Sequence, residues 1–91
     1  MIKSVNLKAI RIDAGTQSRE KLDSHVVTEY AEQFKEGVEF PPITVVFDGN
    51  DYYLADGFHR LLAAQKAGKA SWNCDVIQGT LRDAILYSLS A

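Results

Sequence analysis

The sequence predicts an α+β domain, in which a mixed sheet of about four strands is combined with three helices. Three observations predict this fold class. The 91 residues are enough for one domain. β-prone runs and amphipathic helical patterns alternate along the chain. Clusters of Gly, Pro, Asn and Asp separate these runs, as expected of turns between secondary-structure elements.

The N-terminal part predicts one strand and one helix. Ile2–Leu7 mixes apolar and β-branched residues, which favours a short strand, and residues 13–16 form a turn. Ser24 is typical of a helix N-cap, and the helix should run to about Glu36, before Gly37. Its apolar residues recur at helical spacing on one face: Val26, Val27, Tyr30, Ala31 and Phe34.

A β-hairpin is predicted in the middle of the chain. Pro41 and Pro42 keep the backbone extended and exclude a helix at this junction. Ile43–Phe47 is a strongly β-prone run, and Tyr52–Ala55 is the returning strand. Between them, Asp48–Asp51 reads Asp-Gly-Asn-Asp, which favours a tight turn.

The C-terminal part predicts two helices and one strand. A helix covers Phe58–Ala67 and stops at Gly68, and a strand covers Trp72–Ile77. Thr80 opens the last helix, with Asp83 in the position of a capping box. One face of that helix is expected to pack inward: Leu81, Ala84, Ile85 and Leu89.

Composition limits the classes of function. Twelve acidic and ten basic residues leave a formal charge of −2, which argues against a domain that binds nucleic acid by charge alone. Cys74 is the single cysteine, so the sequence offers no disulfide framework. Without an apolar run of membrane-spanning length or a signal peptide, we expect a cytoplasmic protein with no membrane partner. The last helix has no stop signal before Ala91, which predicts a domain, residues 1–91, cut from a longer protein; the alternative is a helix that frays at a natural chain end.

The segment richest in chemistry is Asp56-Gly57-Phe58-His59-Arg60, where a strand leads into a helix. The first turn of a helix presents unpaired amides and a partial positive charge, and Gly57 lets an anion approach them closely. Two basic residues in that turn would oppose the helix dipole by roughly 0.3–1 kcal/mol each. A bound anion reverses that sign, so the sequence predicts a phosphate site.

Each side chain of this turn has a predicted role and an open alternative. Arg60 can hold two phosphate oxygens, and His59 can donate to a phosphate or transfer a proton. Asp56 can bind Mg²⁺ or orient an attacking hydroxyl or water, which makes Asp56 and His59 the candidate catalytic residues. Alternatively, Asp56 caps the helix, His59 and Arg60 are surface residues, and Phe58 belongs to the core. Gln17 and Arg19, on the polar segment before the first helix, are either further ligands or ordinary loop residues.

Taken in order, Gln17-x-Arg19, the run Phe40–Ile43 and the run Tyr53–Arg60 resemble the N-terminal domain of the ParB family and the wider ParB/sulfiredoxin fold, over essentially the whole chain. Partition-type ParB proteins carry Gly-Glu-Arg-Arg-x-Arg-Ala at the turn and bind CTP; Gly57, Arg60 and Ala63 match that pattern.

Other branches of the fold differ at the same turn. Sulfiredoxins carry Gly-Gly-Cys-His-Arg and bind ATP phosphates there; Phe58 replaces the reducing cysteine, so the resemblance does not extend to sulfinic acid reduction. Archaeal free-serine kinases carry Asp-Gly-His-His-Arg, matching four of five residues. ParB-like proteins of bacteria, phages and plasmids share Asp-Gly-Phe-His-Arg and continue into a basic region resembling a DNA-binding domain.

The resemblance implies a nucleoside triphosphate, ATP or CTP, bound with Mg²⁺. The implied nucleotide-binding residues are Gln17, Arg19, Gly57, Phe58, His59 and Arg60, with Asp56 as the metal ligand. The first hypothesis is a nucleotide-binding regulatory module of a DNA-associated protein, active as a homodimer or through the longer chain. The second is a phosphotransferase or nucleotide hydrolase with Glu20 as base, or a nuclease; the third is a protein-interaction domain without a ligand.

Overall fold

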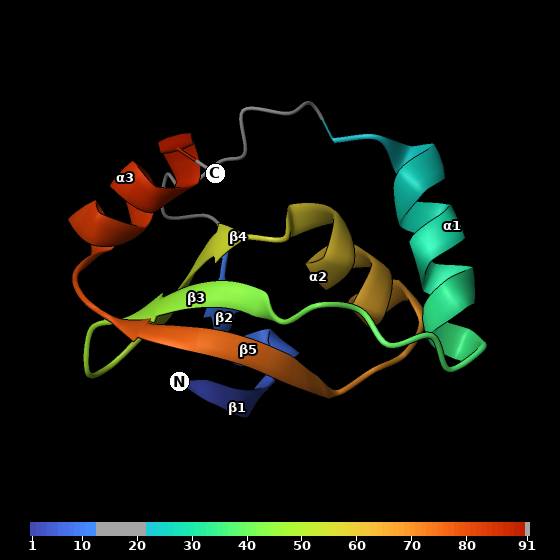
Figure 1. Cartoon of the computed structure of the whole chain (residues 1–91), viewed down its shortest axis with the longest axis horizontal. Coiled ribbons are helices and arrows are strands. Elements are labelled where there is room, and N and C mark those ends of the chain that lie inside the picture. Colours follow the sequence, from blue (N-terminus) through green and yellow to red (C-terminus); the bar gives the residue numbers. More distant parts are fainter. Residues whose placement is uncertain (13–21, 91) are drawn as a thin grey trace.

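The computed structural model describes residues 1–12 and 22–90 and confirms an α+β domain. A mixed sheet has the strand order β1-β5-β3-β4-β2, and α1 and α3 lie at opposite ends of the molecule with α2 between them (Figure 1). The strands are β1 Ile2–Asn6, β2 Ile10–Arg11, β3 Ile43–Phe47, β4 Tyr52–Asp56 and β5 Ser71–Gln78. The helices are the short 3₁₀ helix η1 Leu7–Ala9 and the α-helices α1 Ser24–Lys35, α2 Phe58–Lys66 and α3 Leu81–Ser90.

The sheet has one strand more than the sequence predicts. The additional strand, β2, is two residues long and pairs in parallel with β4, Ile10 opposite Tyr52. A strand this short has no alternating pattern and exists only through its pairing. The first strand ends at Asn6, because Leu7 begins η1 and the Asn6 side chain accepts a hydrogen bond from the Lys8 amide.

The predicted hairpin is confirmed. β3 and β4 are antiparallel, and Oδ1 of Asp48 accepts hydrogen bonds from the amides of Asp51 (2.7 Å) and Asn50 (2.8 Å). These bonds hold the pKa of the Asp48 carboxyl below its ordinary value. Near the other end of β4 the register shifts: Val45 pairs with Leu54, but Thr44 pairs with Asp56. Ala55 is therefore the extra residue of a β-bulge, directly before the turn into α2.

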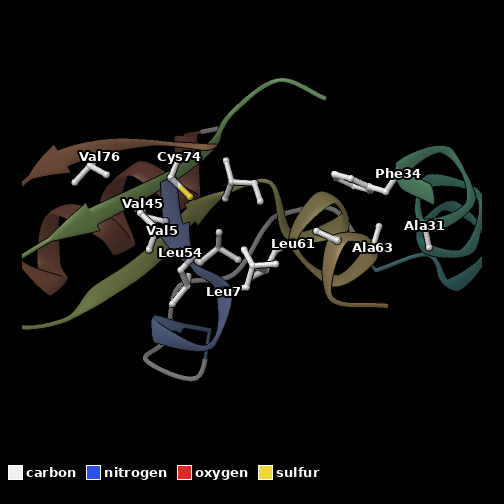
Figure 2. Close-up of a cluster of buried hydrophobic side chains, with 13 residues drawn as sticks. Val5, Leu7, Ala31, Phe34, Val45, Leu54, Leu61, Ala63, Cys74 and Val76 are labelled. Carbon is white, nitrogen blue, oxygen red and sulfur yellow. The ribbon is translucent and has the colours of Figure 1, made fainter. Parts of the chain in front are cut away.

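Two cores cover the two faces of the sheet, because successive strand side chains point to opposite faces. Val45 and Leu54 belong to the larger core under α1 and α2, which Figure 2 shows with Leu61, Ala63 and Phe34 of those helices. Val46, Tyr53 and Ala55 form the smaller core under Ala84 of α3. Side chains of β4 are thus buried on both faces of the sheet, which fixes the position of the turn that follows β4.

Two predictions about the helices are wrong. Asp23, not Ser24, is the N-cap of α1, because its side chain accepts from the amides of His25 and Val26. Leu89 was expected to pack inward but is 48% exposed. Ala84 and Ser88, one turn apart, form the buried face of α3 instead, and the Ser88 hydroxyl donates to the Ile85 carbonyl.

The predicted capping box of α3 is confirmed. The Thr80 amide donates to Oδ2 of Asp83 (2.8 Å), and the Asp83 amide donates to the Thr80 hydroxyl (3.3 Å). Within residues 1–12 and 22–90, no helix is both long enough and apolar enough to cross a bilayer.

Candidate functional site

The turn between β4 and α2 leaves the start of the helix open. Gly57 is the N-cap, at φ 101° and ψ 35°, a left-handed conformation that suits glycine. No side chain of residues 1–12 and 22–90 caps the helix, so the alternative in which Asp56 is the cap is wrong. Among the described residues, no group accepts a hydrogen bond from the amides of Phe58, His59 and Arg60. These three donors and the helix dipole make the turn electropositive.

A pocket of about 300 Å³ opens at this turn. Its size lies at the lower end of the range for ligand sites. Residues from three segments line it: Tyr30 of α1, Phe40 and Pro41 before β3, and Asp56, Gly57, Phe58, His59 and Arg60 of the turn. One wall is therefore aromatic, and the other is the polar start of α2.

Arg60 connects the turn to the segment before β3. Its Nη1 donates to the carbonyl oxygens of Pro41 (3.0 Å) and Pro42 (2.8 Å), and its Nη2 lies 3.7 Å from Oδ2 of Asp56. The Arg60 side chain is 18% exposed. The guanidinium packs over Gly57, where a Cβ would come within 3.0 Å of Nη2. Arg60 thus builds part of the pocket wall and keeps its positive charge there.

His59 connects the same turn to the start of α1. Its Nε2 accepts a hydrogen bond from the backbone amide of Asp23, at 3.0 Å. The ring also lines the pocket. The sequence suggests both basic residues of the turn as phosphate ligands, and in the structure both line the pocket. It does not predict that each also has a protein partner, 18 or more residues away.

Asp56 is the one carboxylate among the described residues that line the pocket. Its side chain is 47% exposed, and its nearest ionic partner is Arg60. Within the described ranges, no group of three or more His, Cys, Asp and Glu side chains gathers around a potential metal position. A metal ion here would therefore depend on Asp56 together with oxygens of a ligand, as Mg²⁺ commonly does at phosphates.

The remaining predicted site residues are Gln17, Arg19, Glu20 and Phe58. Gln17, Arg19 and Glu20 lie outside the described residues. Phe58 is partly buried against the larger core and also lines the pocket, so it belongs to both.

Tyr30 and Phe40 are lining residues that the sequence does not identify. Their ring centroids are 5.1 Å apart, and Phe40 stacks on Phe34 at 4.2 Å. Tyr30 shares the apolar face of its helix with Phe34, so the pattern indicates only a core position. The polar hydroxyl of Tyr30 and the extended Phe-Pro-Pro segment are the signals that could have placed both side chains at an opening.

Cys74 lies in β5, outside the pocket, and is fully buried. Burial raises the pKa of its thiol to about 11. A thiol that keeps its proton at neutral pH is a weak nucleophile.

Several solved structures share this fold. Sulfiredoxin from Arabidopsis thaliana has a TM-score of 0.78 and 26% identity, over 96% of each chain. The C-terminally truncated chromosome-partitioning protein ParB from Caulobacter crescentus, complexed with CTP-gamma-S, has a TM-score of 0.74 and 16% identity, over all of this chain and 54% of that one. The same protein complexed to the centromeric parS site has a TM-score of 0.70 and 16% identity, over 94% of this chain and 44% of that one.

This chain thus spans about half the length of the two ParB chains, at identities that show a common fold. No curated protein matches the chain significantly. The family model that matches is described as the ParB N-terminal domain, and the match covers residues 1–90. The five-stranded sheet, the open turn before α2 and this match lead to one identification: the chain belongs to the ParB N-terminal domain family and has the ParB/sulfiredoxin fold.

Proposed function

We propose that this domain binds a nucleoside triphosphate, with the phosphates at the start of α2. The observation that carries the proposal is the pocket of about 300 Å³ into which the Gly57 turn opens, next to three helix amides without partners among the described residues. Backbone amides and a helix dipole stabilise phosphate oxygens, provided that the backbone can be approached. The pocket at the turn gives that access, and the absence of a Cβ at Gly57 lets the Arg60 guanidinium lie beside it.

The charges around the turn support a phosphate ligand. The Arg60 side chain is 18% exposed, and its ionic contact among the described residues is with Asp56, at 3.7 Å. Its Nη1 is bound to two carbonyl oxygens, so Nε and Nη2 are the donors nearest to Gly57. An anion beside Gly57 would balance a charge that water reaches poorly. Asp56 would hold Mg²⁺ with the phosphates, which also offsets its repulsion of the anion.

The aromatic wall supports the nucleoside part of the ligand. Tyr30 and Phe40 face the pocket from two different segments. Aromatic side chains bind flat apolar rings by stacking, at about 1–3 kcal/mol per base in proteins that bind single-stranded nucleic acids. A phosphate end and an aromatic end in one pocket favour a nucleotide over inorganic phosphate. The common fold with a ParB complexed with CTP-gamma-S makes CTP, beside ATP, the first ligand to test.

In the cell, the domain would act as a regulatory module of a longer, cytoplasmic, DNA-associated protein. A ParB with this fold has been solved in complex with parS DNA, and this chain covers 44% of it. With a net charge of −2, the domain itself is a weak candidate for holding DNA by charge. Binding of nucleotide would favour one of two states of a homodimer or of the DNA-binding part, to the extent that its affinity for them differs.

The test is calorimetric titration of the domain with ATP, CTP, GTP and ADP in the presence of Mg²⁺. We expect at least one triphosphate to bind with a dissociation constant below about 1 mM, which corresponds to a binding free energy of about −4 kcal/mol. Arg60→Ala should weaken it, whereas Lys66→Ala, in the last turn of α2, should not. If none of the four nucleotides binds below that limit, the proposal is wrong.

A second candidate function is phosphoryl transfer or nucleotide hydrolysis. It is favoured by the half-exposed carboxylate of Asp56 at the same pocket, since such reactions depend mainly on positioning and charge neutralisation. In this function Asp56 holds the metal ion and His59 contacts the transferred group. Phosphate release from ATP and CTP distinguishes the two: turnover lost in Asp56→Asn supports the enzyme, and binding without turnover supports the module.

The nuclease alternative is tested with plasmid DNA. Cleavage that survives the double variant Asp56→Ala, His59→Ala would place any nuclease activity away from this turn. Reduction of sulfinic acids is not proposed, because Phe58 occupies the turn and the thiol of Cys74 is buried elsewhere.

A further inference from the structure

The hydrogen bond between His59 and Asp23 fixes the chemical form of the imidazole. A backbone amide can only donate, so Nε2 of His59 must offer a lone pair at a distance of 3.0 Å. A ring that accepts at Nε2 is neutral and carries its single proton on Nδ1. The ring thus remains a donor through Nδ1, and it lines the pocket.

The residue whose amide donates to His59, Asp23, is the N-cap of α1. Oδ1 of Asp23 accepts from the amides of His25 (2.9 Å) and Val26 (3.4 Å), and the Asp23 carbonyl accepts from Val27 (3.1 Å). Asp23 thereby satisfies three of the donors in the first turn of α1. His59 joins this cap to the first turn of α2, across 36 residues of sequence.

We propose that His59 is a neutral hydrogen-bond relay that couples the phosphate pocket to the start of α1, through the Asp23 amide at Nε2 and the ligand at Nδ1–H. The ligand half of this proposal rests on the proposed function, whereas the half concerning α1 does not. As a relay, His59 donates a hydrogen bond to the phosphates from a neutral ring and does not act as a cation. A phosphate oxygen on Nδ1–H polarises the ring and strengthens the bond to Asp23, so that binding stabilises the first turn of α1.

Protonation breaks the relay. A protonated ring has N–H groups on both sides, so its Nε2–H would face the N–H of Asp23 and the bond could not persist. Described charged and titratable groups around the ring come from several elements. They are Arg60 and the N-terminal dipole of α2, the carboxylates of Asp23 and Asp56, and Tyr30, which lines the pocket from α1. The segment before β3 contributes the uncharged Phe40 and Pro41.

Two substitutions at the ring separate its titration from its hydrogen bond. His59→Gln keeps an acceptor at about the position of Nε2 but does not titrate, so it should keep the link at every pH. His59→Leu removes the acceptor.

The first experiment uses the free protein. Nitrogen NMR of the imidazole, and amide exchange at Asp23 and Val26, are followed from about pH 8 to 5, where histidine side chains change charge. We expect the Nδ1–H tautomer at pH 8, and a loss of amide protection on acidification in wild type that is absent in His59→Gln. An Nε2–H tautomer, or equal pH profiles in the two proteins, would overturn the relay.

The second experiment uses nucleotide and Mg²⁺. Protonation of the nucleotide changes its affinity for both proteins equally, so the ratio of the wild-type affinity to that of His59→Gln is free of this effect. On acidification the protonated ring loses the Asp23 bond that positions it, so this ratio should fall by about 2- to 10-fold, the worth of one hydrogen bond; a ring that binds the phosphates through its charge would instead raise the ratio. A rise overturns the neutral relay. If no nucleotide binds while the first experiment gives the expected result, the proposed function fails and the coupling of His59 to α1 stands; the opposite pair of results rejects the relay and leaves the proposed function intact.

Discussion

The guanidinium of Arg60 lies against the bare Cα of Gly57: a Cβ placed on Gly57 would come within 3.0 Å of Nη2, 3.2 Å of Cζ and 3.3 Å of Nε. The two residues are three apart in sequence, and both line the pocket. Glycine is required here for two separate reasons, its backbone conformation and this contact. The two reasons can be tested separately.

We expect Gly57→Ala to lower the free energy of unfolding by more than the ordinary cost of a left-handed alanine, about 1–2 kcal/mol. The matched control is Gly68→Ala, because Gly68 also has a positive φ, 82°, but no atom of the described residues lies within 4 Å of its added Cβ. Urea unfolding of the two variants provides the comparison. Equal losses of stability would show that Arg60 moves aside without cost.

Arg60→Met should destabilise the domain by about 1–2 kcal/mol, because the carbonyls of Pro41 and Pro42 lose a charged donor while the apolar stem is kept. Hydrogen exchange or limited proteolysis should show the loss in the segment before β3. Arg82→Met, on the exposed side of α3, is the control for the change of charge. Arg60→Lys should be intermediate, since an ammonium cannot reproduce the planar guanidinium. Unchanged protection around Pro41 would contradict this assignment.

Asp83→Ala should cost about 0.5–2 kcal/mol, the usual worth of a helix cap, because the Thr80 amide and hydroxyl both lose their acceptor. The effect should appear in α3 and in the smaller core under Ala84. Nucleotide affinity should stay constant, since no residue of α3 lines the pocket. Thermal unfolding and calorimetry check both points; a loss of affinity equal to that of Arg60→Ala would contradict the separation of the two cores.

Burial of Cys74 predicts a specific pH dependence. The pKa of its thiol rises from 9.0 to about 11 in the folded protein, so between these values the unfolded chain binds fewer protons than the folded one. The contribution of Cys74 to stability is therefore present below pH 9 and lost as the pH rises toward 11. Unfolding free energies of wild type and Cys74→Ala should converge over this range. At neutral pH, thiol reagents should label Cys74 only after unfolding; fast labelling of the native protein would reject the burial.

Local signals in the sequence predicted the elements that end in a recognisable turn. The Asp-Gly turn of the hairpin, the Thr80–Asp83 capping box and the strand–turn–helix at Gly57 are each specified by neighbouring residues. Long-range pairing was not predictable in this way. β2 is defined by its partner β4, and the cap of α1 falls on Asp23 because that carboxylate reaches the first amides.

The site itself was predicted only in part. The open turn follows from Gly57 and its neighbours, and both basic side chains of the turn line the pocket. Their protein partners, the amide of Asp23 and the carbonyl oxygens of the two prolines, belong to backbone groups far along the chain. Backbone partners carry no residue signature, so neither bond can be inferred from residue types. The aromatic wall was missed for a related reason, because Tyr30 has the same helical spacing as a core residue.

The bulge at Ala55 has a consequence for how this fold tolerates change. β4 contains one residue more than the part of β3 with which it pairs. This extra residue determines which face of the sheet the side chains after it point to. If Ala55 were deleted, the side chains between it and the start of α2 would point to the opposite face of the sheet. Asp56 would then be aimed at the wrong side, although every residue type of the turn was retained. The count of residues in one strand is thus as restrictive here as their identity.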